Sequence, residues 1–596
     1  MNYSFAAEIH CVVFRNHQRL LVVSSLRSLL LICGLLAALS GCGGVRPVSP
    51  TVGVNTNGST SPPASKTGTL LFDDALTGSG IDFVIKQTHT PLNILQTLGH
   101  GVGLIDVDGD GLLDIVLVGP DKARLYHNLG NYHFQEITAG SGLRQNGDWE
   151  GIAVGDYDND GRPDLYLCGY NCSALYHNEG KGRFREVTTQ AGLDTIKPGK
   201  AGIGDWRTSA AFVDLDGDGK LDLYVCRYAE FGPHSPQLCS TIGKAERYSC
   251  PPDSYTPQHG LLYHNLGQGR FRDVTVASGM QKSAGRALAV AFADVEGKGR
   301  LSLAIANDER PGDLFINKGG MRFVDQGEIS GTAYSAEGHV HGGMGADWAD
   351  VDGDGKLDLF VPTYEKETKS LYRNLGQGLF NEASLQMGLG DSMRPWVIFG
   401  CKFLDYDNDG WPDLITTSGH VLDNTAAVYP GTQYRQPIQL FHNVNGMFTE
   451  TTSQMSASVR QLIVGRGLAV GDMNNSGHMD AVVTNLDGPP VLLRNGCQNA
   501  NHWLTLRLIG TRCNRDAYGA RLDVEAGGRT QALQVSNAGS FLSASDPRVH
   551  IGLGAAKRVG KVRIRWPDGH EDVFKDIAAD QFVHLTEGSP QITKGF

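Results

Sequence analysis

Aspartate side chains are concentrated in a nine-residue pattern that recurs along the chain. Its first copy, DVDGDGLLD (residues 106–114), places four carboxylates around two glycines. Carboxylates held this close repel one another, so the stretch suits either a solvated turn or an oxygen cage for a hard cation. Side chains at positions 1, 3, 5 and 9, the backbone carbonyl at position 7 and a water would supply the roughly six to eight oxygens that Ca2+ prefers.

Five copies keep all four aspartates, and we predict a structural Ca2+ in each of them rather than a plain polar hairpin turn. Magnesium suits the loops less well, because it requires near-octahedral geometry and retains its waters. The predicted ligands are Asp106, Asp108, Asp110, Leu112 and Asp114; Asp156, Asp158, Asp160, Arg162 and Asp164; Asp214, Asp216, Asp218, Lys220 and Asp222; Asp350, Asp352, Asp354, Lys356 and Asp358; and Asp405, Asp407, Asp409, Trp411 and Asp413. Leu112, Arg162, Lys220, Lys356 and Trp411 would act through their backbone carbonyls.

Two further copies depart from the pattern. DMNNSGHMD has only two charges and is a weaker candidate, so we expect five or six ions in total. Its predicted ligands are Asp472, Asn474, Ser476 and Asp480. DVEGKGRLS, which begins at Asp294, has Lys298 at position 5 and Ser302 at position 9. There we expect the lysine ammonium to take the place of the ion, and no metal to bind.

The loops differ from EF-hands beyond position 9. An EF-hand requires a bidentate glutamate at position 12 and helices on both sides. Position 12 of the five intact copies is instead occupied by Leu117, Leu167, Val225, Val361 and Thr416. These residues lie in apolar runs that are typical of strands. We therefore expect a calcium clamp inside a β-hairpin, with a structural rather than a sensory role.

The acidic loops also define the repeat that must position them. The seven first aspartates are separated by 50, 58, 80, 56, 55 and 67 residues. Each loop joins two apolar runs, and a second pair of alternating segments follows around an Asn- and Gly-rich turn, as in LYHNEGKGRFREVT. Each copy is therefore a four-stranded meander. We predict an all-β fold, with a seven-bladed β-propeller over residues 69–496 and a small β-sandwich-like domain over residues 497–588, followed by a tail over residues 589–596.

A comparison of the repeat units with one another predicts how the ring closes and locates an insertion in the third unit. The seventh unit lacks a fourth strand after PVLLRNG, whereas residues 70–83 resemble the fourth strands of the other units. We predict that this N-terminal segment completes the last blade and hides its edges. Residues 227–260 form a Pro-, Ser-, Tyr- and Cys-rich insertion, which is interpreted as a binding loop or as a decoration that covers an edge.

Eight cysteines follow the N-terminal region, and their pairing is open. Cys239 and Cys250 would staple the insertion, and Cys168 with Cys172 and Cys497 with Cys513 are neighbours in sequence that could also pair. Cys226 and Cys401 both flank strand residues and suit buried free thiols at least as well as a bridge.

The repeats resemble the FG-GAP/VCBS propellers of the integrin α-chain type over about residues 70–496. The C-terminal stretches NRDAYGAR, SDPRVHIGLG and VRIRWPDG resemble the ASPIC/UnbV domain that follows such propellers in bacterial relatives of cartilage acidic protein. The first resemblance implies extracellular adhesion or ligand binding on a calcium-stiffened ring. The second implies an architecture but no defined molecular activity.

The N-terminal region reads as an export signal. A basic lead, a short apolar run and LSGC (residues 39–42) resemble a lipoprotein signal peptide over residues 1–42, with lipidation at Cys42. A plain transmembrane anchor is the alternative, but 11 apolar residues are short for a span. Residues 43–68 form a Gly-, Ser-, Thr- and Pro-rich disordered tether. We expect a bacterial lipoprotein that faces the periplasm or the cell exterior and contacts the membrane only through its lipid.

Composition and motifs favour a binding protein over an enzyme. The net charge is −12 and no Lys/Arg cluster is present, which argues against nucleic acid as the partner. No Ser lies between glycines at −2 and +2, and no P-loop occurs. We expect a non-catalytic protein that binds a protein or glycan ligand. The alternatives are a lectin and a polysaccharide-acting enzyme of the lyase type on the same scaffold.

Overall fold

The computed structural model describes residues 70–87, 89–193, 202–240 and 245–595. The predicted signal peptide, Cys42 and the tether lie outside these residues. Among the described residues, no helix combines the length and the apolar character needed to cross a bilayer.

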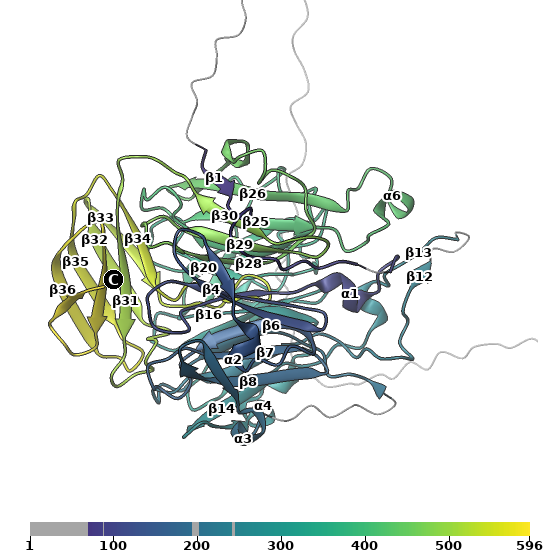
Figure 1. Ribbon diagram of the computed structural model, residues 1–596, viewed down its shortest axis with the longest axis horizontal. Coiled ribbons are helices and arrows are strands. Elements are labelled where there is room, and N and C mark those ends of the chain that lie inside the picture. The colour runs from purple at the N-terminus through teal and green to yellow at the C-terminus, as the bar shows by residue number, and fades with distance from the viewer. Residues whose placement is uncertain (1–69, 88, 194–201, 241–244, 596) are drawn as a thin grey trace, which may run out of the picture. The chain divides into compact units, whose positions relative to one another are not determined.

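Seven four-stranded sheets, each antiparallel throughout, make up the described part of residues 70–496 (Figure 1). In sheet order their strands are β2 (Val102–Ile105), β3 (Asp114–Gly119), β4 (Lys122–Asn128) and β5 (Phe134–Glu136); β6 (Asp148–Gly155), β7 (Asp164–Tyr170), β8 (Cys172–Gly180) and β9 (Arg183–Glu186); β10 (Arg207–Val213), β11 (Asp222–Arg227), β14 (Leu261–Gly267) and β15 (Arg270–Asp273); β16 (Ala287–Ala293), β17 (Ser302–Asn307), β18 (Asp313–Asn317) and β19 (Phe323–Asp325); β20 (Asp347–Ala349), β21 (Asp358–Val361), β22 (Ser370–Gly376) and β23 (Leu379–Glu382); β24 (Ile398–Leu404), β25 (Asp413–Gly419), β26 (Arg435–Val444) and β27 (Met447–Glu450); and β28 (Gly465–Gly471), β29 (Asp480–Asn485), β30 (Val491–Asn495) and β1 (Phe72–Asp74).

Short helices punctuate the connections between these strands. The α-helices are α1 (Ile94–Leu98), α2 (Thr138–Ser141), α3 (Thr188–Ala191), α4 (Thr275–Ser278), α5 (Gly327–Ser330) and α6 (Thr425–Val428), and the 3-10 helices are η2 (Pro252–Ser254), η3 (Met280–Lys282) and η4 (Thr452–Gln454). Several of them follow a fourth strand and begin with a hydroxyl that accepts the N–H of the third strand, as Thr138 Oγ1 does from Leu125 at 2.9 Å. The hydroxyl satisfies a buried donor, because that N–H lies beyond the paired part of the sheet.

The sheets form a closed ring. The first strands β2, β6, β10, β16, β20, β24 and β28 pack in this order, and β28 packs against β2. These strands are rich in Gly and Ala, as in ALAVAFA of β16, which suits the crowding near the axis. The hydrophobic core lies between neighbouring sheets, where Ile152 and Val116 belong to one buried cluster. The fold is the all-β propeller that the repeats predict.

The N-terminal strand β1 belongs to the last sheet. It pairs antiparallel with β30, with Phe72 opposite Asn495 and Asp74 opposite Leu493. The two ends of the propeller region, about 420 residues apart in sequence, therefore share one sheet. The pairing satisfies the hydrogen-bonding groups on the outer edge of β30, which would otherwise be exposed.

The insertion in the third unit contains the two-stranded pair β12 (Cys239–Ser240) and β13 (Arg247–Tyr248). A disulfide joins Cys239 to Cys250, with Cα atoms 4.8 Å apart. The other two neighbouring pairs are free: Cys168, Cys172, Cys497 and Cys513 are buried thiols, as are Cys226 and Cys401. The pairing of Cys168 with Cys172, which the sequence left open, does not form, and their sulfurs turn to different carbonyls, those of Thr208 and Asp148. Cys497 and Cys513 do not pair either.

The C-terminal region forms two further four-stranded sheets, shown in yellow in Figure 1. One has the order β34 (Val549–Gly554), β31 (His502–Ile509), β37 (Gln581–Thr586) and β38 (Ile592–Lys594), and the other β33 (Arg529–Gln534), β32 (Arg521–Ala526), β35 (Arg558–Arg565) and β36 (Glu571–Ala578). Strands β31 and β37 are parallel, and the remaining pairs are antiparallel.

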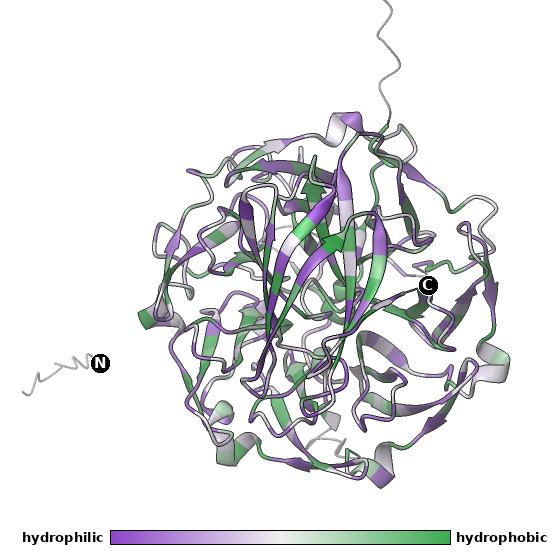
Figure 2. Cartoon of the chain, turned by 90° about the vertical axis from the view of Figure 1, so that its left-hand side faces the viewer, coloured by the Kyte–Doolittle hydropathy of each residue, from purple (hydrophilic) through white to green (hydrophobic). Residues whose placement is uncertain are grey.

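A segment of this C-terminal domain, residues 537–546, enters the ring; we call it the axial segment. It bonds to first strands on several sides: Leu542 O accepts from Ile152 N at 3.1 Å, Ser540 N donates to Ala346 O at 2.6 Å, and Asp546 N donates to Val470 O at 3.0 Å. Figure 2 views the molecule from the side that carries the C-terminal sheets, with the propeller sheets around them. The centre of the ring is therefore filled by the chain itself.

Candidate metal centres

Every acidic loop connects the first and second strands of its sheet. The loop of residues 106–114, for example, runs from the end of β2 to the first residue of β3. Glycines in the loop adopt positive φ, as Gly111 does at 88°. This left-handed conformation favours glycine and lets the backbone curl around the aspartates. The hairpin geometry thus brings the carboxylates of one loop together.

The carboxylate at position 1 organises the loop backbone. Asp106 Oδ1 accepts from Gly109 N at 2.8 Å and Oδ2 accepts from Gly111 N at 3.0 Å. Asp156 does the same with the N–H groups of Asp160 and Gly161, at 2.9 and 2.7 Å. Each carboxylate oxygen retains a lone pair, so these bonds shape the loop without excluding a cation.

The carboxylate at position 9 is the most buried of the four. Asp114 has no exposed surface, its Oδ2 accepts from Val107 N at 2.9 Å, and its Oδ1 accepts from Asn128 N at 2.7 Å. The same two bonds recur at Asp413, from Tyr406 and from an asparagine of the third strand. Position 9 therefore ties the loop to two strands of its sheet, a role that the spacing alone did not indicate.

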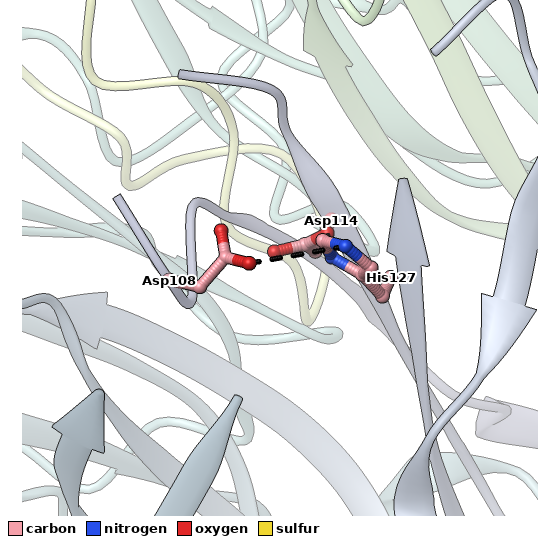
Figure 3. A group of neighbouring side chains, drawn as sticks. All are labelled: Asp108, Asp114 and His127. Atoms are coloured by element: carbon pink, nitrogen blue, oxygen red, sulfur yellow. Dashed lines mark hydrogen bonds and ion pairs between the residues drawn. The ribbon is translucent and has the colours of Figure 1, made fainter. Parts of the chain in front are cut away.

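A histidine of the third strand joins the loop, and the sequence reading missed it. His127 Nδ1 donates to Asp114 Oδ1 at 3.0 Å, and its Nε2 lies 3.8 Å from Asp108 Oδ2 (Figure 3). His177, His264 and His442 take the same place in their repeats. The available signal was the repeated LYHN or LFHN run, whose third residue is this histidine. In the sixth repeat, the hydrogen bond between His442 and Asp413 raises the pKa of His442 to about 9.

Two repeats use other side chains at this point. Arg373, which stands where the others have histidine, pairs with Asp352 and lies 3.6 Å from Asp354. In the seventh repeat the Tyr132 hydroxyl, from the neighbouring sheet, donates to Asp480 Oδ1 at 3.0 Å. The chain thus supplies a donor or a positive charge beside each group of aspartates.

The side chains at positions 3 and 5 are more exposed than the others. The carboxylate oxygens of Asp106, Asp108 and Asp110 lie within 4.8 Å of one another. At position 7 the backbone N–H turns back to position 5, as Leu112 N does to Asp110 Oδ1 at 2.8 Å and Trp411 N does to Asp409 Oδ1 at 2.8 Å. The arrangement leaves an open, solvent-facing side at which an ion would reach the loop.

Burial makes negative charge unfavourable in these loops. It raises the pKa of Asp156, Asp358 and Asp480 to about 8. It raises the pKa of Asp214 and Asp114 to about 7, with like charge from Asp222 adding to the shift at Asp214. A divalent cation would offset this cost, because it favours the ionised form of every carboxylate that surrounds it.

Two predicted ligand oxygens lack a hydrogen-bond partner within the described part of the chain. Asp350 Oδ1 and Asn474 Oδ1 are both buried and unpaired. Buried polar atoms are nearly always satisfied, so each of these points to a ligand that the protein atoms do not replace. The donor set consists of carboxylate and amide oxygens, which fits a hard cation such as Ca2+. The observation holds in one intact loop and in the weaker Asp472 loop.

The loop that begins at Asp294 is built differently. Lys298 Nζ lies 3.0 Å from Glu296 Oε1 and has no described bond to Asp294. Arg565, from the C-terminal domain, instead places its guanidinium 2.5 Å from Asp294 Oδ2. Lys298 thus neutralises the carboxylate at position 3, as expected of a lysine in place of an ion, whereas the cation on the first aspartate comes from 271 residues further along the chain.

Comparisons with known proteins agree with this architecture. A family model of FG-GAP-like repeats matches residues 106–167, 159–225 and 294–361, and the ASPIC and UnbV model matches residues 510–592. Cartilage acidic protein 1 of Mus musculus is 24% identical over 388 residues, which are 64% of this chain and 54% of that protein. The chain thus spans about half the length of this relative.

Two solved structures are similar at lower levels. A lectin of Agrocybe aegerita that recognises non-reducing terminal N-acetylglucosamine is 17% identical, with a TM-score of 0.36, over 66% of this chain and 86% of its own. A rhamnogalacturonan lyase is 12% identical, with a TM-score of 0.34, over 67% and 71%. These scores carry no argument about function. Parts of the chain thus match FG-GAP-like repeats, and its C-terminal region matches an ASPIC and UnbV domain.

Proposed function

We propose that the protein is an exported, lipid-anchored propeller that binds structural Ca2+ in five or six loops and acts as a non-catalytic binding or adhesion protein for a protein or glycan ligand. The observation that carries the calcium part is the pair of buried, unpaired ligand oxygens, Asp350 Oδ1 and Asn474 Oδ1. An ion satisfies them and offsets the charge of the surrounding carboxylates. The recurrence of the same loop at every sheet supports a scaffold role for the ions.

The filled ring supports a binding role at the surface. The axial segment occupies the centre of the ring, where residues such as Leu542 and Ser540 bond to the first strands. An active site at this end of the channel would have to displace those bonds. We therefore look for the ligand on the surface rather than in the channel, and the alternative of a lyase-type enzyme finds less support.

The disulfide-stapled insertion is the surface that we favour. Two other segments converge on it: Asn424 Nδ2 donates to Arg247 O at 2.6 Å, and Asn93 Nδ2 lies 3.3 Å from Gln237 Oε1. Tyr429, five residues after Asn424, is 45% exposed. These two hydrogen bonds and the disulfide hold the insertion against its two neighbouring segments. Segments that are held before a ligand arrives lose less entropy on binding.

The calcium part is tested by counting ions. Native mass spectrometry of the folded protein with Ca2+ is expected to show five or six ions, and Mg2+ at the same concentration fewer. The matched variants are Asp350→Asn, which alters an intact loop, and Asp294→Asn, which alters the loop without a predicted ion. The first is expected to lose one ion and the second none. A wild-type protein that binds no Ca2+ would contradict the proposal.

The binding part is tested on arrays of glycans and with pull-downs of candidate protein ligands, each with Ca2+ and with EDTA. Binding that Ca2+ restores after EDTA supports a calcium-stiffened binding protein, and the array separates glycan from protein ligands. Turnover of a defined polysaccharide without binding to other ligands would favour the enzyme alternative instead.

A further inference from the structure

The C-terminal domain lies against the acidic loops of several repeats, and the chemistry of its contacts differs between them. At the first and seventh loops, Arg548 donates to Gly111 O at 3.3 Å and to Asp472 O at 2.8 Å. At the fifth loop, Arg521 donates to Gly355 O at 2.6 Å. All three acceptors are main-chain carbonyls of the loops.

The second and sixth loops are contacted through an asparagine side chain. Arg515 N donates to Asn159 Oδ1 at 2.8 Å, and His550 Nε2 donates to Asn408 Oδ1 at 2.6 Å. Both asparagines are at position 4, which is not a predicted ligand. Within the described residues, the hydrogen bonds and ion pairs from the domain to these five loops leave their carboxylates free. The domain therefore bonds to main-chain and asparagine oxygens of these loops, and Arg548 and Arg529 act on the nearby carboxylates only through space.

The fourth loop is the exception. Arg565 ends strand β35 and places its guanidinium on Asp294 Oδ2, with a second, longer bond of 3.4 Å to Gly297 O. The Asp294 side chain is only 6% exposed. Ser302, at position 9, accepts from Asn317 N through its hydroxyl at 3.3 Å, the bond that a carboxylate accepts in other repeats. The loop thus keeps its hairpin with the Arg565 guanidinium on the carboxylate at position 1 and the Lys298 ammonium on the carboxylate at position 3.

We propose that Arg565 is the resident cation of the fourth loop, and that it anchors the C-terminal domain to the propeller without a metal. The inference rests on the proposed calcium sites for its contrast with the other loops. A guanidinium suits this place because it is always charged and donates in two directions, to the carboxylate and to the loop carbonyl. On the first, second, fifth, sixth and seventh loops the domain instead bonds to main-chain carbonyls and to asparagine side chains.

The anchor is tested by comparing Arg565→Ala with Arg563→Ala. Arg563 is exposed two residues earlier on the same strand and is the matched control. At a fixed temperature, the amide hydrogen-exchange rate of residues 510–592 is expected to be at least about tenfold higher in Arg565→Ala than in the wild-type protein. The rate in Arg563→Ala should equal the wild-type rate, and the rate in Arg565→Lys should lie between the two. Equal exchange in the Arg565→Ala and Arg563→Ala variants would overturn the anchor.

The cation role is tested by rebuilding the loop. Lys298→Asp with Ser302→Asp restores acidic side chains at positions 1, 3, 5 and 9. We expect native mass spectrometry to show one additional Ca2+ when Arg565→Ala is added, and at least about tenfold weaker binding of that ion when Arg565 is present. Equal binding in both backgrounds would show that the arginine does not occupy the ion's place.

The two experiments separate this inference from the proposed function. If the wild-type protein binds no Ca2+, the proposed function fails, whereas the exchange comparison still decides whether Arg565 anchors the domain. If the rebuilt loop binds no ion in either background, the cation role is overturned, and the exchange comparison still decides whether Arg565 anchors the domain.

Discussion

Removal of Ca2+ is expected to lower the melting temperature by about 12 °C. A site held at a free Ca2+ concentration 100-fold above its Kd contributes about 2.7 kcal/mol, so five intact loops contribute roughly 13 kcal/mol. The compact unit from Thr67 to Phe596 has about 530 residues, and at about 2.1 cal/mol/K per residue its unfolding entropy is about 1.1 kcal/mol/K. The ratio of these two values gives the shift.

The assay is differential scanning calorimetry at one protein concentration, with Ca2+ and with EDTA. The control is EDTA with about 1 M NaCl, which shortens the Debye length to about 3 Å and screens repulsion between carboxylates without filling the loops. If NaCl restores the melting temperature as fully as Ca2+ does, the loops need screening and not coordination. A shift below about 3 °C on chelation would refute the structural role of the ions.

Three further predictions concern single residues. A β-carbon at Gly552 would lie 1.9 Å from Asp405 Oδ2, so Gly552→Ala should displace the sixth loop and remove one Ca2+ from the mass-spectrometric count; an unchanged count contradicts this. A β-carbon at Gly101 would lie 1.8 Å from Leu542 O, so Gly101→Ala should cost about 1–3 kcal/mol in urea unfolding, and an unchanged midpoint would argue against the axial segment. Burial lowers the pKa of His341 to about 4. The contribution of this histidine to the free energy of unfolding should therefore be fully present above pH 6.5 and should fall by up to about 3 kcal/mol as the pH drops to 4. In pH-dependent unfolding, His341→Gln should make the free energy of unfolding depend less steeply on pH over this range.

The strands that the sequence predicted best are those with strong alternation or a nearby acidic loop. The loop spacing located the start of each second strand, because position 9 is the first residue of strands such as β3 and β25. Strand β36 carries a weak sequence signal, because only Phe574 and Ile577 of its eight residues are buried. A strand that faces solvent along most of its length carries too little apolar signal to be recognised.

The pairing of cysteines and charges was harder to predict, because it depends on contacts between distant parts of the chain. Cys168 and Cys172 are four residues apart, yet their sulfurs turn to different carbonyls. The histidines on the acidic loops were missed for a similar reason. His127 is 13 residues from Asp114 and His442 is 29 residues from Asp413, so no fixed spacing links them.

The sequence by itself determined the hairpin loops and the aspartates that they carry, because these depend on residues within nine positions of one another and on the curl that glycine permits. Only the tertiary structure decided what surrounds each loop. Arg565 reaches Asp294 across 271 residues, and the axial segment fills the ring from a domain outside the repeats. Such contacts follow from how the sheets close and pack, and packing is a property of the assembled chain, which short-range spacing does not encode.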